Sequence, residues 1–262
     1  MRVEQLGDGD PDLAIIGGIH GDEPCGVRAI ERLLDARPSL DRPVKLVVAN
    51  EEALDRGVRY VDVDLNRAFE PSTPEDAHER VLGEQLAAEI KGTIALSIHS
   101  TQSYDEPFAI TSGVDPFVEE IAPHLSVEVL VDAGPAVEGR LFETDADIIE
   151  VEAGYQGTTA AAENAYRLAR DFLTATGALP GDTVPKRLPV YELGPPIRKP
   201  QASAYEVFAE NFTAVDAGDR FAAADDDPLH ATERFWPVLL SAYGYRDIFG
   251  YQSKKRGTIV PG

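Results

Sequence analysis

The chain has 262 residues, 43% of them hydrophobic, which is enough for one large domain or for a medium domain with a small appendage. Its 46 Asp and Glu outnumber its 24 Lys and Arg, and the net charge of −22 excludes nucleic acid as a partner, because nucleic-acid binding needs a basic footprint. No stretch approaches the roughly 18 apolar residues of a membrane span, so we expect no membrane partner.

The acidic residues are spread along the chain, and only six of the 24 basic residues are lysine. Such a surface suits a protein that stays hydrated in high salt, so we predict a halophilic protein; an ordinary acidic enzyme is the alternative. The N-terminus has no basic region followed by an apolar core, which predicts a cytoplasmic location. The single cysteine, Cys25, excludes an internal disulfide, and we expect it as a small buried side chain at a helix start.

A buried strand and a glycine-rich turn come first among the predicted elements. Residues 13–19 (LAIIGGI) are typical of such a strand, and Pro24 suits the first turn of the helix that follows. Further strands are predicted at 44–50, 93–100, 107–111, 127–131 and 147–154, and long helices at about 72–91 and 157–177. This alternation predicts an α/β fold with a mostly parallel sheet between helices.

The composition changes near residue 180. The stretch TGALPGDTVPKRLP (176–189) is rich in Gly and Pro, and short extended pieces with little helical period follow it. We therefore predict an α/β domain over residues 1–179 and a small β-rich domain over residues 180–262.

Polar side chains cluster at the ends of three predicted strands. His20 and Glu23 follow the first strand, His99 ends another, and Glu150 and Glu152 share one face of a third. Because the carboxyl ends of parallel strands meet at one sheet edge, we expect these side chains to lie close together. Catalytic zinc sites take three protein ligands, often two His and one carboxylate, and His20, Glu23 and His99 supply that set.

Each of these signals has an ordinary structural alternative. A single His-x-x-Glu is common by chance, and a lone histidine at a strand end is more often a hydrogen-bonded core residue than a ligand. Either acid of the Glu150 and Glu152 pair could be a structural partner of a base. Their convergence on one edge of one sheet favours a metal site.

Four motifs in chain order resemble the succinylglutamate desuccinylase/aspartoacylase family, a branch related to the zinc carboxypeptidases. GGIHGDE (17–23) resembles the family signature, and RYVDVDLNRAFE (59–70) resembles its Arg-Tyr-x-Asp-x-Asp-Leu-Asn-Arg block. SIHS (97–100) resembles its third-ligand strand and EVEAG (150–154) its catalytic-glutamate strand. The resemblance covers about residues 13–155 and implies a zinc carboxypeptidase-like fold and an amidohydrolase that removes an acyl group from an N-acyl amino acid.

The resemblance also implies a role for each matched residue. His20, Glu23 and His99 would hold one Zn²⁺ per chain, and Glu152 would act as the general base. Arg59 would stabilise the oxyanion of the tetrahedral intermediate. Two further residues, Asn66 and Arg67, would hold the carboxylate of a small anionic substrate, since a guanidinium meets a carboxylate with two hydrogen bonds. Asp64 would orient an arginine or a ligand.

Two other functions stay open at this stage. One is a zinc carboxypeptidase that acts on small peptides, and the other is a metal-binding protein without catalysis. Both a monomer and a homo-oligomer are compatible with the sequence. We expect Arg140 to remain in its glycine-flanked loop, and we expect the aromatic stretch 235–251, with Tyr243, Tyr245 and Tyr251, to form core rather than cap the pocket.

The net charge generates a prediction about salt. An anionic substrate is repelled by a surface of charge −22 at low salt, whereas at 1 M salt the Debye length falls to roughly 3 Å and the repulsion is screened. We expect kcat/KM for an acidic substrate to rise between low and molar salt, measured while circular dichroism confirms an intact fold. A flat or falling profile would contradict this.

Overall fold

The computed structural model describes residues 1–70, 72–134 and 140–261. Within these residues, one sheet holds ten strands: β1 (Arg2–Leu6), β2 (Leu13–Gly17), β3 (Val44–Val48), β4 (Ile94–Thr101), β5 (Phe108–Thr111), β6 (Leu130–Asp132), β7 (Asp147–Tyr155), β8 (Leu188–Arg198), β12 (Trp236–Val238) and β13 (Ile248–Ile259). A second, small sheet contains β9 (Tyr205–Val207), β10 (Arg220–Ala224) and β11 (Asp227–His230). The helices are α1 (Cys25–Ala36), α2 (Glu51–Arg56), α3 (His78–Glu89), α4 (Pro116–Ile121) and α5 (Thr159–Ala175), with short 3₁₀ helices at Leu65–Arg67, Ala122–His124 and Leu141–Glu143.

The large sheet is mixed and contains two parallel blocks. Its strand order is β1-β3-β2-β4-β7-β5-β6-β8-β13-β12. Strands β3, β2, β4 and β7 run parallel to one another, and so do β5, β6 and β8; the two blocks meet antiparallel where β7 pairs with β5. The predicted α/β fold with a mixed, mostly parallel sheet between helices is therefore confirmed.

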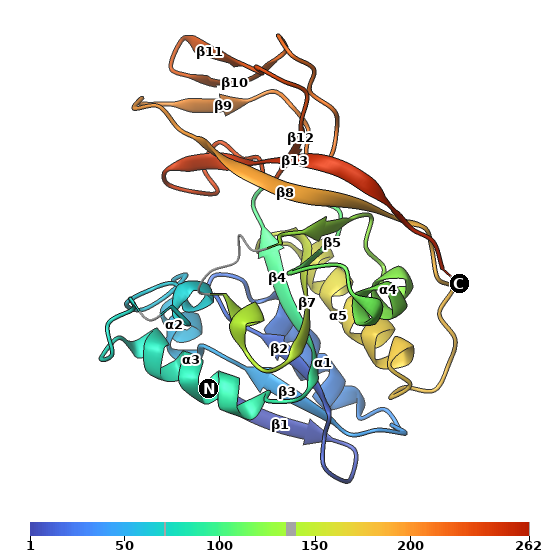
Figure 1. Ribbon diagram of the computed structural model, residues 1–262. Helices are drawn as coiled ribbons and strands as arrows, with labels where there is room; N and C mark the ends of the chain where they lie inside the picture. Colours follow the sequence, from blue (N-terminus) through green and yellow to red (C-terminus); the bar gives the residue numbers. More distant parts are fainter. Residues whose placement is uncertain (71, 135–139, 262) are drawn as a thin grey trace.

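Helices cover both faces of this sheet (Figure 1). Along β2, Leu13 and Ile15 pack with the core beneath α1 and α5, while Ala14 and Ile16 pack with the core beneath α3. Successive side chains on a strand point to opposite faces, so a strand buried on both sides consists of consecutive apolar residues. This explains why the sequence LAIIG shows no polar alternation.

The predicted strands form with small shifts, whereas β1, α2 and α4 were not predicted. Strand β1 (RVEQL) was missed because it is an edge strand with mostly exposed side chains, and α2 and α4 were missed because each is only six residues long. The helix predicted from residue 72 begins instead at His78. There the backbone N–H of His78 donates to Asp62 Oδ2 at 2.8 Å, so a carboxylate from another segment caps the helix in place of the local Ser and Thr.

The C-terminal residues are β-rich, and they continue the large sheet. Strand β8 pairs parallel with β6, and β13 then pairs antiparallel with β8 along a long ribbon. Figure 1 shows this ribbon above the helix-covered part, with β9, β10 and β11 beyond it. The division at residue 180 stays a prediction, since the hydrogen-bonded sheet passes across it.

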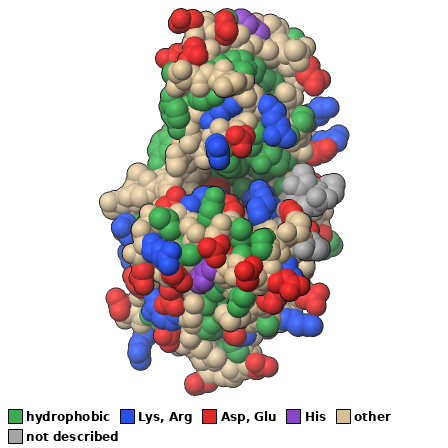
Figure 2. All heavy atoms as spheres, turned by 90° about the vertical axis from the view of Figure 1, so that its left-hand side faces the viewer, with side chains coloured by type: hydrophobic (Ala, Val, Ile, Leu, Met, Phe, Trp, Pro, Cys, Tyr) green, Lys and Arg blue, Asp and Glu red, His purple; other side chains and the backbone are tan. Residues whose placement is uncertain are grey.

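Acidic side chains are exposed both in the helix-covered part and in the C-terminal part. Figure 2 shows Asp and Glu over both the helix-covered part and the C-terminal part on the face that it displays, with a hollow at the waist between them. Among the described residues, no helix is both long enough and apolar enough to cross a membrane.

Two glycines shape the turn after β2 for different reasons. Gly18 has φ +69°, a left-handed conformation that glycine adopts without strain. Gly21 instead allows a close approach, because a Cβ at this position would lie 2.1 Å from the backbone carbon of Ala53 in α2. Gly21 therefore lets the turn pack against α2.

This contact predicts that Gly21→Ala is destabilising. The added methyl group overlaps backbone that cannot move without displacing α2, and overpacking of this kind costs about 1–3 kcal/mol. Urea unfolding at fixed salt measures the effect. Gly257→Ala is the matched control, because a Cβ there meets nothing within 4 Å. Equal stability of the two variants would show that the turn tolerates the extra atom.

Candidate functional site

The carboxyl ends of three neighbouring parallel strands meet at one edge of the large sheet. His20 follows β2, His99 lies near the end of β4, and Glu152 lies near the end of β7, where the register pairs it with His99. Ligands bind at such edges because the connections between strands leave room there. A cavity of about 280 Å³ opens at this edge, and its walls include every predicted site residue: His20, Glu23, Arg59, Asn66, Arg67, His99 and Glu152.

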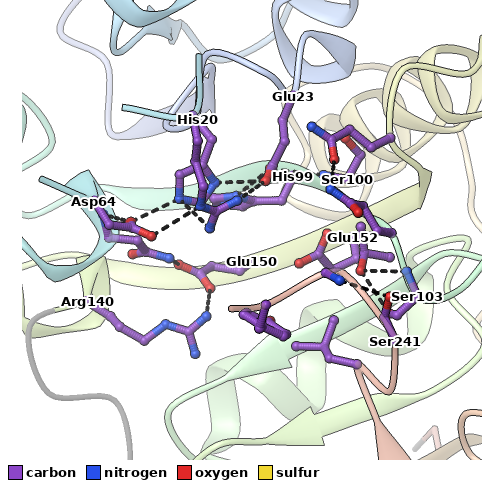
Figure 3. Close-up of a pocket in the computed structure, with 18 of the residues that line it drawn as sticks. His20, Glu23, Asp64, His99, Ser100, Ser103, Arg140, Glu150, Glu152 and Ser241 are labelled. Atoms are coloured by element: carbon purple, nitrogen blue, oxygen red, sulfur yellow. Dashed lines mark hydrogen bonds and ion pairs between the residues drawn. The ribbon is translucent and has the colours of Figure 1, made fainter. Parts of the chain in front are cut away.

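Two imidazoles and one carboxylate converge in the wall of this cavity. His20, Glu23 and His99 are buried and present ligand atoms that all lie within 4.8 Å of one another. His20 Nδ1 is 2.9 Å from Glu23 Oε1, and His99 Nδ1 is 3.2 Å from Glu23 Oε2. Figure 3 shows the three side chains pointing toward one another. This donor set is one that catalytic zinc sites use.

The other nitrogen of each imidazole has its own partner. His20 Nε2 lies 3.1 Å from Asp64 Oδ1, and His99 Nε2 lies 3.0 Å from Ser97 Oγ. His20 Nε2 also lies 3.0 Å from Arg59 Nη2. Contacts of this kind orient the imidazoles of metal-binding histidines, and here both Nδ1 atoms are turned toward Glu23. His20 Nδ1 is buried and, although it lies 2.9 Å from Glu23 Oε1, makes no well-aligned hydrogen bond with any residue that the structure describes. The residues present therefore fit a divalent cation.

The electrostatics of the three residues agree with this fit. Burial lowers the pKa of His20, but the carboxylates of Glu23 and Asp64 outweigh burial and raise this pKa to about 9. Burial raises the pKa of Glu23, but His20 and His99 outweigh it and hold that pKa well below its ordinary value. The buried carboxylate of Glu23 thus stabilises a positive charge on the neighbouring His20. A metal ion that takes this place displaces the His20 proton.

Glu152 faces the same cavity from the neighbouring strand. Its Oε2 is buried and, within residues 1–70, 72–134 and 140–261, has no hydrogen-bond partner. Burial and the charge of Glu23 raise the pKa of Glu152 to about 7, although His99 opposes the shift. A carboxyl group with a pKa near neutrality can both take up and release a proton at ordinary pH.

Arg59 lies against the candidate metal ligands. Its Nη1 donates to Glu23 Oε1 at 2.8 Å, and its Nε donates to Asp64 Oδ2 at 3.3 Å. Burial lowers the pKa of Arg59, but these two carboxylates outweigh it and raise the pKa, so the guanidinium stays charged. The N–H of Gly21 also donates to the Arg59 carbonyl at 3.1 Å. The side chain is therefore held at the rim of the group.

One half of the cavity is charged. Asn66 Nδ2 donates to Glu150 Oε1, and Arg140 Nη2 donates to Glu150 Oε2, both at 3.2 Å. Arg67 is exposed at the mouth, and its Nη1 donates to the Asn66 carbonyl at 2.6 Å. The expectation for Arg140 was wrong: its side chain is only 15% exposed and lines the cavity, because the buried Glu150 carboxylate pairs with it.

The other half of the cavity is uncharged and polar. Figure 3 shows Ser103 and Ser241 on the opposite side of Glu152 from Glu150 and Arg140. The lining of this half comes from the end of β4, the end of β7 and the loop after β12: Thr101, Gln102, Ser103, Gln156, Ser241 and Gly244.

Aromatic residues of the C-terminal part also reach the cavity. Tyr245 and Tyr251 line it, whereas Tyr243 points outward and is 66% exposed. The expectation that this stretch forms core was only partly right. Sequence spacing gives no signal for these tyrosines, because the fold of the C-terminal strands decides which of them face the metal group.

A buried acid outside the cavity holds the segment that carries Arg59 and Asn66. Glu79, in the first turn of α3, is fully buried. Its Oε1 accepts the N–H of Val61 at 2.6 Å and the Asn50 amide at 2.9 Å, and its Oε2 accepts the N–H groups of Asp62 and Val63 at 3.0 and 3.1 Å. Sequence analysis missed this role, because an acid in a first helical turn is ordinary.

We predict that replacing Glu79 lowers the stability of the fold in a pH-dependent way. Burial raises the pKa of Glu79, but the backbone hydrogen bonds outweigh it and lower the pKa below the ordinary value of 4.5. The carboxylate therefore stabilises the fold above that value, and its contribution is lost as the pH falls through the lowered pKa. At neutral pH, Glu79→Gln should lower the free energy of unfolding by about 2–3 kcal/mol, since hydrogen bonds to a charged group are lost.

Urea unfolding of both proteins across the pH range measures this difference. The difference should shrink below pH 4.5, where Glu79 of the unfolded wild type begins to protonate, and should vanish once the pH passes the lowered pKa of the folded state. An equal difference at neutral and strongly acidic pH would mean that the charge of Glu79 is not what holds the segment.

Comparisons with known proteins agree with this geometry. A family model described as the succinylglutamate desuccinylase/aspartoacylase catalytic domain matches residues 9–170, more than half of the chain. A probable aspartoacylase from Nostoc sp. is 28% identical over 127 residues, which cover 44% of this chain and 43% of that protein. An N-acyl-aromatic-L-amino acid amidohydrolase (carboxylate-forming) from Rattus norvegicus is 30% identical over 148 residues, covering 50% and 45%. The matched stretches thus span less than half the length of these two relatives.

Solved structures share the fold over nearly the whole chain. The crystal structure of murine aminoacylase 3 superposes with a TM-score of 0.74 at 22% identity, and the match covers 96% of this chain and 98% of that one. At this level of identity the likeness establishes the architecture.

Proposed function

Since the chain belongs to the succinylglutamate desuccinylase/aspartoacylase family, we propose that it is a zinc-dependent amidohydrolase that cleaves the amide bond of a small anionic N-acyl amino acid. The observation that carries the proposal is the buried group of His20, Glu23 and His99 beside Glu152 in one cavity. The names of the similar proteins, which include an aspartoacylase and an amino acid amidohydrolase, support the same reaction class.

His20, Glu23 and His99 would hold one zinc ion. When bound, the ion supplies a Lewis acid that polarises the amide carbonyl and makes a water molecule acidic near neutral pH. The chain's own part is to fix the geometry, because Asp64 and Ser97 hold the two buried imidazoles.

Glu152 is the proposed general base. Its carboxylate takes the proton from the attacking water and then gives it to the leaving amine, which needs a group whose proton moves easily in both directions. The raised pKa and the unpartnered Oε2 of Glu152 suit this work. Glu150, two residues earlier, is already engaged by Asn66 and Arg140, which supports the choice of Glu152.

Arginines serve the two charged parts of the reaction. Arg59, held between Glu23 and Asp64, would donate to the oxyanion that forms as water adds to the carbonyl. Arg67 at the mouth would hold the substrate carboxylate and place the scissile amide beside Glu152. Asn66, for which the same role was predicted, donates its amide to Glu150.

Replacement of the base separates metal binding from catalysis. Glu152→Gln should retain one zinc ion per chain, because the three ligands are untouched, while kcat falls at least 100-fold, the order of effect that general base catalysis supplies. Elemental analysis and assays on a panel of N-acyl amino acids and dipeptides measure both quantities. Turnover confined to dipeptides would indicate a carboxypeptidase instead.

Two controls accompany this variant. Glu163→Gln changes an exposed residue of α5 that pairs with Arg32, and it should leave turnover unchanged. Removal of zinc by a chelator should abolish wild-type turnover, and added zinc should restore it. Full activity of Glu152→Gln would show that Glu152 is not the general base.

A further inference from the structure

Glu150 is a buried acid in the cavity that the proposed reaction does not use. It lies on β7 two residues before Glu152, is 2% exposed, and contributes to the wall of the charged half. A buried carboxylate needs partners, and both of its oxygens have one. Oε1 accepts from Asn66 Nδ2, and Oε2 accepts from Arg140 Nη2.

These two donors are of the kind that binds a substrate carboxylate. A guanidinium together with a side-chain amide forms a strong site for an anion. In this chain the Glu150 carboxylate occupies that site from within (Figure 3). A second carboxylate from a substrate would have to compete for these two donors with Glu150, which is part of the chain.

The ion pairs leave one cation for an anionic ligand. Three arginines line the cavity. Arg59 forms ion pairs with Glu23 and Asp64. Arg140 forms an ion pair with Glu150. Arg67 makes no ion pair with any residue in the described parts of the chain; its Nη1 donates to a backbone carbonyl. One guanidinium matches one carboxylate.

We propose that Glu150 takes the place of a second substrate carboxylate and so restricts the enzyme to N-acyl amino acids with a single carboxylate. This inference rests on the proposed function and names its substrate class. The amino acid side chain would be one that donates a hydrogen bond to Glu150, such as an amide, a hydroxyl or an ammonium group.

The physical basis is discrimination by charge. An acidic side chain has no proton to donate to Glu150, and the nearby cation, Arg140, is already paired, so the buried charge of that side chain would stay uncompensated. A side chain of the same shape that ends in an amide donates to Glu150 and keeps every polar atom paired. The amide side chain thus gains a charge-assisted hydrogen bond to Glu150, whereas the acidic side chain gains none and keeps a buried charge without a partner.

N-acetyl-L-glutamine and N-acetyl-L-glutamate form a matched pair of probes, because they have the same shape and differ by one charge. For the wild type we expect kcat/KM to favour the glutamine compound by about tenfold or more, the scale of one hydrogen bond to a charged group. Glu150→Gln frees Arg140, and it should reduce this preference by about tenfold or reverse it. Both comparisons are made at molar salt, where general repulsion by the surface is screened.

Glu143→Gln is the matched control. Glu143 is exposed, follows Arg140 closely in the chain, and does not line the cavity, so removal of its charge should leave the ratio unchanged. The wild-type ratio by itself tests the proposal even if Glu150→Gln does not fold. A wild-type preference for the glutamate compound, or an unchanged ratio in Glu150→Gln, would overturn it.

A binding measurement distinguishes failure of this inference from failure of the hydrolase assignment. In the Glu152→Gln background, calorimetry gives the Kd of both uncleaved compounds, and the same tenfold discrimination should appear in their affinities. Binding discrimination without hydrolysis by the wild type would support the role of Glu150 and overturn the proposed reaction. Hydrolysis of both compounds with equal affinities and equal kcat/KM would support the proposed reaction and overturn the role of Glu150.

Discussion

The buried carboxylate of Glu23 is the constraint on which the site depends. A charge in a protein interior must have a partner, and here the partners are two imidazoles and a guanidinium that come from three separate segments. The ligand group is therefore a small, electrostatically closed unit in which a proton or a metal ion supplies the balancing charge.

Support for that unit comes from elements that never touch the cavity. Glu79 binds three successive backbone N–H groups of the segment that carries Arg59 and Asp64, and α3 is in turn capped by Asp62 from the same segment. Such reciprocal hydrogen bonds leave an irregular loop with little freedom to move. A loop can then hold side chains nearly as firmly as a strand does, which catalysis requires.

The cavity has a charged half and an uncharged half, with Glu152 between them. The charged half contains its own acid, Glu150, so its net charge is lower than the number of arginines suggests. The polar half offers hydroxyl and amide groups, and no Lys or Arg is among its lining residues as far as the structure describes them. In the proposed reaction, a substrate that bridges the two halves would place its anionic end at Arg67 and its acyl group on the neutral side.

The sequence by itself determined the fold class, the buried strands before residue 155 and the motif residues that converge at the sheet edge. These depend on local patterns: apolar runs, glycines at a turn, and motifs whose order along the chain is informative. Only the tertiary structure decided that Arg140 lines the cavity, that Tyr245 faces it while Tyr243 does not, and that Glu150 is paired while Glu152 has a free oxygen. The physical reason is that these choices depend on which charged partners meet across segments distant in the chain, and no local pattern records such meetings.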